Sequence, residues 1–181
     1  MRDDGLVLRG YATTFGEVIE SSLGSQMFAM TAFNNWVSSP NRRSIFCLNH
    51  SKSDEWGSTD DYLSLFLDKR GLAFEYRFPD THDAKHYRLC AETRNGASIG
   101  FQYRRTHDEV IDGKTITVVD QVDLEDISLV DIPVNRSAFA MLCRPDQTLS
   151  EVCQSGQLFS DGKYLAFKNA AKQIALKLQT L

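Results

Sequence analysis

The sequence has no apolar run close to the roughly 20 residues that span a membrane. It also has no run of Lys or Arg longer than a pair, and its formal net charge is -4, so it lacks the basic surplus that favours nucleic-acid binding. The residues after Met1 turn polar at once, which is unlike a secretory signal. We therefore expect a soluble intracellular protein that binds neither membrane nor nucleic acid.

Cysteine is scarce, and the four cysteines are far apart in the chain. None forms a CxxC pair or has the spacing of a zinc finger, so neither a disulfide framework nor a metal centre is indicated. We expect free thiols in a reducing compartment. These residues are Cys47, Cys90, Cys143 and Cys153.

The chain has 181 residues, of which 42% are hydrophobic, enough to bury one core. We expect a single domain over residues 1–181, with a β-rich core over about 6–140 and a helical extension over about 145–181. Thr148 and Glu151 have the spacing of a capping box at the start of that extension. Its apolar residues include Ile174 and Leu178, at the spacing of an amphipathic helix.

Alternating apolar and polar residues predict six or seven strands, joined by turns at Gly71, Asn95-Gly96 and Asp112-Gly113. A helical pattern occupies residues 80–92, and a shorter one lies near 31–37. An antiparallel sheet of this size tends to close or fold over, which predicts a barrel or sandwich decorated with helices. The expected strands are 5–15, 43–48, 62–67, 72–78, 97–103, 114–122 and 123–131.

Ser98 lies in the strand predicted over residues 97–103. The alternation there turns Ile99, Phe101 and Tyr103 towards a core and leaves Ser98 and Gly100 on a bare opposite face. A hydroxyl beside glycine on a rigid strand is a possible nucleophile, although most serines in such strands are merely small.

His50 and Asp126 could complete a nucleophilic site. His50 follows a buried strand at the point where the chain leaves the core. This position is compatible with either a structural histidine or a general base. Asp126 shares a strand face with Ser128, opposite Ile127 and Leu129, so it could orient a base on the surface that carries Ser98. The alternative is a solvated acidic strand end.

His82 and His86 are spaced i, i+4 on the predicted helix, which is a possible metal pair. No third ligand stands at a usual spacing, and HDAKH lacks the glutamate of the HExxH motif. A solvated helix face is favoured, and we expect no metal and no cofactor. An unrelated hydrolase that uses these histidines is the weaker alternative.

Five segments in order resemble the prohead maturation proteases of tailed bacteriophages (caudoviruses). They are GYATTF, LNH, GLAFEYRFPDT, SIGF and LEDISLVDIPVNRSA, and they cover about residues 8–140. That family resembles in fold the assemblin serine proteases of herpesviruses. The resemblance implies a mainly β fold with peripheral helices (α+β), built as a closed antiparallel β-barrel.

The resemblance also implies a serine endopeptidase of viral capsid maturation. Such an enzyme acts inside the assembling prohead in the host cytoplasm. It cleaves scaffold protein, the scaffold-like arm of the major capsid protein, or both, and often cleaves itself. Its partners are then these substrates and further copies of itself in a homodimer or higher oligomer.

For the site, the resemblance implies Ser98 as nucleophile and His50 as the base that takes its proton. The third position usually holds glutamate in the family, whereas this chain has Asp126, with Glu125 one residue earlier. Strand parity favours Asp126. Arg136 is a candidate for stabilising the oxyanion, by its position after the last core strand.

The aspartate in place of glutamate leaves one alternative open. The chain could be a catalytically impaired relative that binds capsid or scaffold protein as an assembly factor. The helical extension could cap the barrel, form a dimer interface or anchor the enzyme to scaffold, and Ile174→Asp or Leu178→Asp would test the dimer.

Overall fold

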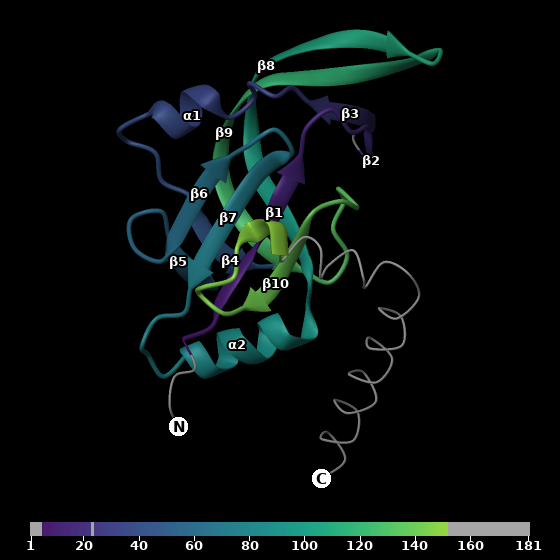
Figure 1. Ribbon diagram of the computed structural model, residues 1–181. Coiled ribbons are helices and arrows are strands. Elements are labelled where there is room, and N and C mark those ends of the chain that lie inside the picture. Colours follow the sequence, from purple (N-terminus) through teal and green to yellow (C-terminus); the bar gives the residue numbers. More distant parts are fainter. Residues whose placement is uncertain (1–4, 23, 152–181) are drawn as a thin grey trace.

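A computed structural model describes residues 5–22 and 24–151 and shows two packed β-sheets with helices at their margins (Figure 1). Strand and helix bounds follow in chain order: β1 (Val7–Thr14), β2 (Ile19–Ser21), β3 (Gly24–Phe28), α1 (Asn34–Ser38), β4 (Ile45–Leu48), β5 (Glu55–Ser58), β6 (Leu63–Leu67), β7 (Gly71–Arg77), α2 (Ala84–Thr93), β8 (Gly96–Ile111), β9 (Lys114–Val130) and β10 (Phe139–Cys143). Cys153, Ile174 and Leu178 lie outside the described residues, so the predictions that concern them stay predictions.

The two sheets differ in how their strands run. One is antiparallel, in the order β10-β1-β7-β6. The other is mixed: β9 pairs antiparallel with β8, and it also pairs parallel with β3 near its start and with β4 near its end. The 17-residue strand β9 therefore pairs with three other strands and holds the second sheet together.

The expected closed antiparallel β-barrel is wrong. Over the described part of the chain both sheets are open, with β10 and β6 at the edges of one and β2 and β5 at the ends of the other. A closed antiparallel barrel needs every strand to pair antiparallel with its neighbours, whereas β9 pairs in parallel with two distant segments, β3 and β4. The fold is nevertheless mainly β, with α1 and α2 outside the sheets, as expected.

The core lies between the two sheets. Phe46 of β4 stacks on Tyr76 of β7, with ring centroids 4.5 Å apart, and thereby links one sheet to the other. Buried residues of β1, β7, β8 and β9 join them in one continuous cluster, together with Trp56 of β5. Tyr76 donates its buried hydroxyl to the Trp56 carbonyl at 2.8 Å, so its polar end is satisfied.

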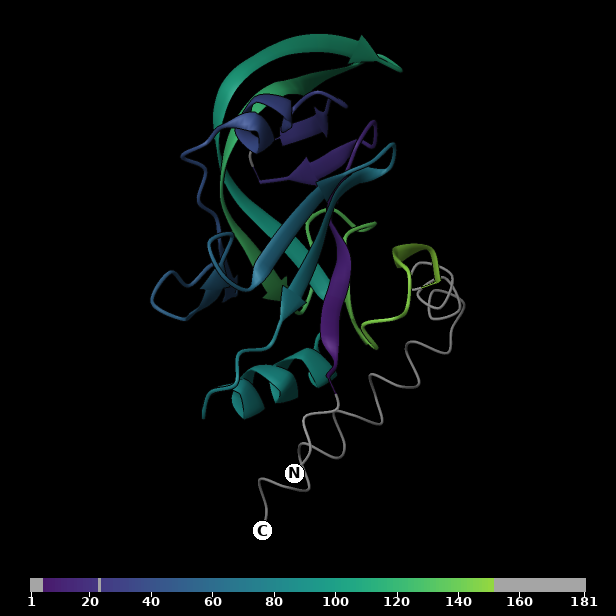
Figure 2. The same ribbon diagram turned by 60° about the vertical axis from the view of Figure 1, so that its left-hand side comes forward.

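The hairpin of β8 and β9 extends well beyond this core (Figure 1). The strand predicted over residues 97–103 is too short, because β8 continues to Ile111, just before the predicted turn at Asp112-Gly113. The far part of β8 has no apolar face because it projects into solvent, so alternation could not reveal it. Figure 2 shows α1 and β3 beside this end of the molecule and α2 at the opposite end.

Of the remaining elements, some were predicted from the sequence and others were not. The β6–β7 hairpin, α1, α2 and the capping box are confirmed, since Thr148 Oγ1 accepts from the Glu151 amide at 3.3 Å and Glu151 accepts from the Thr148 amide at 2.6 Å. The short strands β2, β3, β5 and β10 were not predicted, and the strands expected over 114–122 and 123–131 are one. Three described cysteines are free thiols, as expected: Cys47, Cys90 and Cys143.

None of the helices in the described part of the chain has the length and apolar content needed to cross a bilayer.

Glu75 of β7 gives a first testable prediction. This buried carboxylate accepts from Arg9 Nε at 2.7 Å and from Arg77 Nε at 2.8 Å. Burial raises the pKa of Glu75, but the two guanidinium groups more than offset it and leave the pKa below its ordinary value. Glu75→Gln should lower the free energy of unfolding at pH 7 by about 1–3 kcal/mol, because it removes one partner of a buried charge cluster.

The pH dependence follows from the depressed pKa. A carboxylate of this kind stabilises the fold above its unfolded pKa, and that contribution is lost as pH falls through the folded value. The difference between Glu75→Gln and wild type in urea unfolding should therefore shrink as pH falls from about 5 towards 3. Glu109→Gln, on the exposed hairpin, is the control with little effect. An equal difference at pH 7 and pH 3 would contradict the assignment.

Candidate active site

The register of β8 on β9 gathers small and polar residues on one face. Ser98 lies opposite Ser128, and Gly100 lies opposite Asp126. On the other side of β9, β4 places Cys47 beside Ser128. These pairings join three strands, so a polar strip crosses the sheet where β4 ends.

A tight turn after β4 brings His50 to this strip. Asn49 and His50 both have left-handed backbones, with φ of 49° and 60°, which non-glycine residues adopt only at a cost of order 1 kcal/mol or more. The turn is held by hydrogen bonds: the Asn49 amide donates to the Leu129 carbonyl at 3.1 Å and the His50 amide to Ser128 Oγ at 3.0 Å. Strain of this kind is typical of a functional site.

Three side chains distant in sequence meet here. His50 Nε2 lies 3.0 Å from Ser98 Oγ, and His50 Nδ1 lies 2.7 Å from Asp126 Oδ1. The carboxylate only accepts, so Nδ1 carries a proton and the neutral ring keeps a lone pair on Nε2 for the Ser98 hydroxyl. The Asp126 side chain is 3% exposed and the imidazole is 40% exposed, so the acid is enclosed while the base is open to solvent.

The carboxylate of Asp126 is kept ionised inside the protein. Burial raises its pKa, but hydrogen bonds from His50 and Ser128 outweigh this and hold the pKa below its ordinary value. Ser128 is fully buried and donates to Asp126 Oδ1 at 2.8 Å. Since its oxygen also accepts from the His50 amide, one hydroxyl ties the backbone of the base to the acid that the base contacts.

Cys47 lies in the same strip but is not a competing nucleophile. Its Sγ lies 3.0 Å from Ser128 Oγ and is buried. Burial raises the pKa of the Cys47 thiol to about 11. The thiolate, which is the reactive form of cysteine, is therefore almost absent at neutral pH.

The other acid considered, Glu125, points elsewhere. Its two carboxylate oxygens accept from Gln102 Nε2 at 2.6 Å and from Lys52 Nζ at 2.7 Å, and these bonds lower its pKa. Of these two acids, Asp126 is the one that contacts the His50 ring. The shorter acid reaches the imidazole because the left-handed turn carries the ring down onto β9.

Arg136 is an exposed residue of the connection between β9 and β10. Its neighbour Asn135 bonds the Thr13 and Thr14 hydroxyls at the end of β1, and Ser137 bonds Glu17. Within the described part of the chain Arg136 has no hydrogen bond or ion pair with the three residues that meet at the site. Its role at an oxyanion stays a prediction.

The two histidines expected on one helix face do not form a cluster, because α2 begins at Ala84 and His82 precedes it. His82 is exposed, and His86 Nε2 lies 3.7 Å from Cys90 Sγ. Over residues 5–22 and 24–151, no three His, Cys, Asp or Glu side chains are grouped so that they could hold a metal ion.

Two residues of the site were not recognised as functional in the sequence. Ser128 was noted only as a small neighbour of Asp126, and Gly100 only as part of a bare face. A Cβ atom at Gly100 would lie 1.9 Å from Asp126 Oδ2, so the glycine makes room for the carboxylate. Strand parity places both residues on the correct face, but only the pairing of β8 with β9 shows what they contact.

Comparison with known proteins gives one result. The family model of the caudovirus prohead serine protease matches residues 1–150 of this chain, a stretch that includes all three residues that meet at the site. A search of curated proteins found no match.

Proposed function

Because the chain belongs to the caudovirus prohead serine protease family, we propose that Ser98, His50 and Asp126 are its catalytic triad. The observation that carries this proposal is the pair of contacts at His50, 3.0 Å to the Ser98 hydroxyl and 2.7 Å to the Asp126 carboxylate. The order of hydroxyl, imidazole and buried acid is the one that activates a serine nucleophile.

Each residue then has a defined task. Ser98 Oγ attacks the scissile carbonyl carbon while His50 Nε2 takes the hydroxyl proton. Asp126 holds Nδ1–H in place and stabilises the imidazolium that forms. The same proton passes from Nε2 to the leaving amine, and water then repeats the sequence to release the acyl group. A partly exposed base above an enclosed acid suits this task, since substrate can approach from the solvent side.

The substrates follow from the family. A prohead protease acts on the proteins of an assembling phage capsid, and we propose that this one cleaves scaffold protein, the scaffold-like arm of the major capsid protein, or both. We also propose that it cleaves itself, acts within the prohead in the host cytoplasm and forms a homodimer or higher oligomer. The continuous core that links the two sheets supports one protease domain.

The aspartate in place of the family's glutamate was the reason to consider a catalytically impaired assembly factor. The geometry of Asp126 does not support that alternative. Asp126 makes the contact with the imidazole that the longer glutamate would make, and its lowered pKa keeps it charged. An assembly factor without activity would need no enclosed, ionised carboxylate at this place.

Co-expression with the major capsid and scaffold proteins tests the function. Cells that make the wild-type enzyme should yield capsid or scaffold protein shortened at a defined bond, as seen by intact mass spectrometry. Cells that make Ser98→Ala should yield only full-length protein. Identical masses from the two cultures would contradict the proposal.

Gly100 gives a prediction on the geometry of the acid. Gly100→Ala places a methyl group against Asp126 Oδ2, so the carboxylate must move away from His50. We expect kcat/KM to fall by about 100-fold or more, since a displacement near 1 Å is enough for that loss.

Ile99→Val is the matched control, because it shortens the neighbouring side chain on the opposite face and leaves Asp126 untouched. It should lower stability by about 1 kcal/mol with little change in kcat/KM. If the Gly100 variant is folded by circular dichroism and cleaves at the wild-type rate, the steric argument is wrong.

A further inference from the structure

We propose that a polar cavity beside the triad binds an acidic side chain of the substrate, about four to six residues from the scissile bond. This inference rests on the proposed function and adds a specificity site to it. The cavity, with a volume of about 440 Å³, lies between the outer face of β8 and β9 and the segment that connects α1 to β4. Its charged lining consists of Arg42, Arg43, Arg104, Asp123 and Glu125.

The cavity lining includes neighbours of the catalytic residues on the same strands. Gln102, which lines it, follows Ser98 and Gly100 at the spacing that keeps all three on one side of β8. Its amide donates to Glu125, and Glu125 in turn accepts from Lys52, two residues after His50. These two hydrogen bonds connect the segment after His50 to two residues of the cavity lining, Gln102 and Glu125.

The distance along β8 sets the substrate position. A strand rises about 3.3 Å per residue, so Gln102 lies roughly 13 Å and Arg104 roughly 20 Å along β8 from Ser98. A substrate chain bound in extended form has the same rise. A side chain about four to six residues from the cleaved bond would therefore reach the cavity.

The charges of the lining indicate what it binds. Arg104 Nε donates to Asp123 at 2.7 Å, and Arg43 pairs with Glu55 and Asp60 on the far side. Arg42, in contrast, has no ion pair with a carboxylate in the described ranges. Its guanidinium carbon lies 5.9 Å from the centre of the Trp36 ring.

A guanidinium held near an aromatic ring and free of a carboxylate is suited to bidentate binding of one. Among the residues that the structure describes, the other charges of the lining are already paired, so Arg42 is the cation that the cavity offers to a ligand. An Asp or Glu side chain of the substrate supplies the matching group, whereas Lys would be repelled.

Synthetic peptides test this inference. They would span the junction identified in co-expression, with Glu, Gln or Lys placed in turn at each position from eight residues before to eight after the bond. The wild type should cleave the Glu peptide about tenfold faster than the Lys peptide, in kcat/KM, at one position within the four-to-six window.

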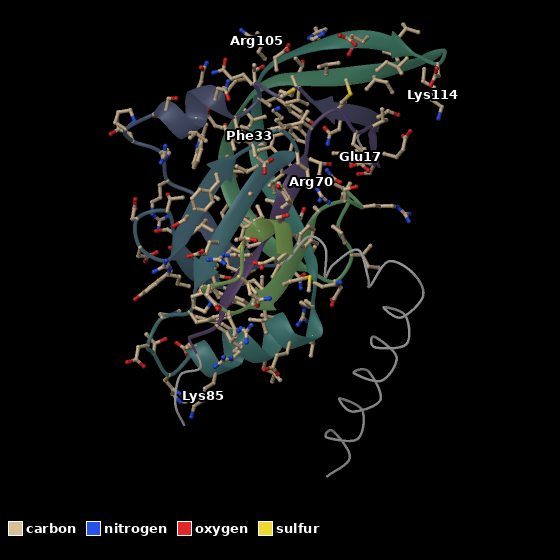
Figure 3. All side chains as sticks on the ribbon, viewed as in Figure 1. Glu17, Phe33, Arg70, Lys85, Arg105 and Lys114 are labelled. Atoms are coloured by element: carbon tan, nitrogen blue, oxygen red, sulfur yellow. The ribbon has the colours of Figure 1, made fainter. Side chains whose placement is uncertain are left out.

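Arg42→Ala should abolish the preference for Glu over Lys at that position, while Arg42→Glu should reverse it. Lys85→Ala is the matched control. Lys85 lies on α2, at the end of the molecule opposite the β8–β9 hairpin that carries Arg105 and Lys114 (Figure 3). Wild-type cleavage without any charge preference in the window would overturn the cavity assignment and leave the protease intact. If the wild type cleaves no peptide and trims no capsid protein, the proposed function fails, and this inference with it.

Discussion

Ser98→Ala should lower kcat for capsid-protein cleavage by about 10⁵- to 10⁶-fold without unfolding the protein. The variant keeps the imidazole and its buried acid but has no oxygen to attack the scissile carbonyl. In the described residues the Ser98 hydroxyl has one hydrogen-bond partner, His50 Nε2 at 3.0 Å, so little stability depends on it. Cleavage by purified protein, followed over hours to days, gives the residual rate.

A fluorophosphonate probe gives an independent measure of the same hydroxyl. It should label the wild type at Ser98 and leave Ser98→Ala unlabelled, with the adduct located by peptide mass spectrometry. Ser53→Ala is the control, since this serine lies in the segment just after His50, and its hydroxyl hydrogen-bonds that of Ser51 at 3.0 Å, away from the three residues of the site. Retained labelling or retained cleavage in Ser98→Ala would rule out Ser98 as the nucleophile.

Asp126→Asn should have the second largest effect, a fall in kcat of about 10⁴-fold. An asparagine can turn its amide towards Nδ1 and donate to it. The imidazole would then carry its proton on Nε2 and could no longer accept from Ser98. Because the side chain is almost fully enclosed, solvent cannot restore the missing charge.

Glu125→Gln is the informative comparison, because it changes the neighbouring acid in the same way. Glu125 contacts Lys52 and Gln102 instead of His50, so we expect a loss below about tenfold. Both variants would be compared in single-turnover cleavage at several pH values. A larger loss in Glu125→Gln than in Asp126→Asn would transfer the role of third residue to Glu125.

Much of the candidate site depends on local patterns that the sequence displays. Alternation along β9 separates Asp126 and Ser128 from Ile127 and Leu129, and this alone prefers Asp126 to Glu125. The end of an apolar run marks the place where His50 leaves the core. The side chains of a strand alternate whatever its partners are, so the face that carries a residue is a local property.

The partners of each strand are not a local property. The residues of β4 do not indicate that this strand pairs in parallel with the end of β9. Those of β3 likewise do not indicate that it pairs in parallel with the first half of β9. The expected closed barrel is antiparallel throughout, and the long strand β9 contradicts it because it pairs in parallel with both β3 and β4. Pairing is decided by which long-range contacts bury the most apolar surface, and periodicity does not encode them.

The sequence by itself therefore determined the family, the strand faces of Ser98 and Asp126, and the three residue types at the site. It placed Tyr103 towards the core, where the structure leaves that side chain 45% exposed. Only the tertiary structure decided that the three side chains of the site meet: 48 residues separate His50 from Ser98, and 76 separate it from Asp126. It also decided the space that Gly100 leaves for the carboxylate and the bridge that Ser128 makes. Both depend on the register between strands, which is set by packing across the whole sheet and not by any one segment.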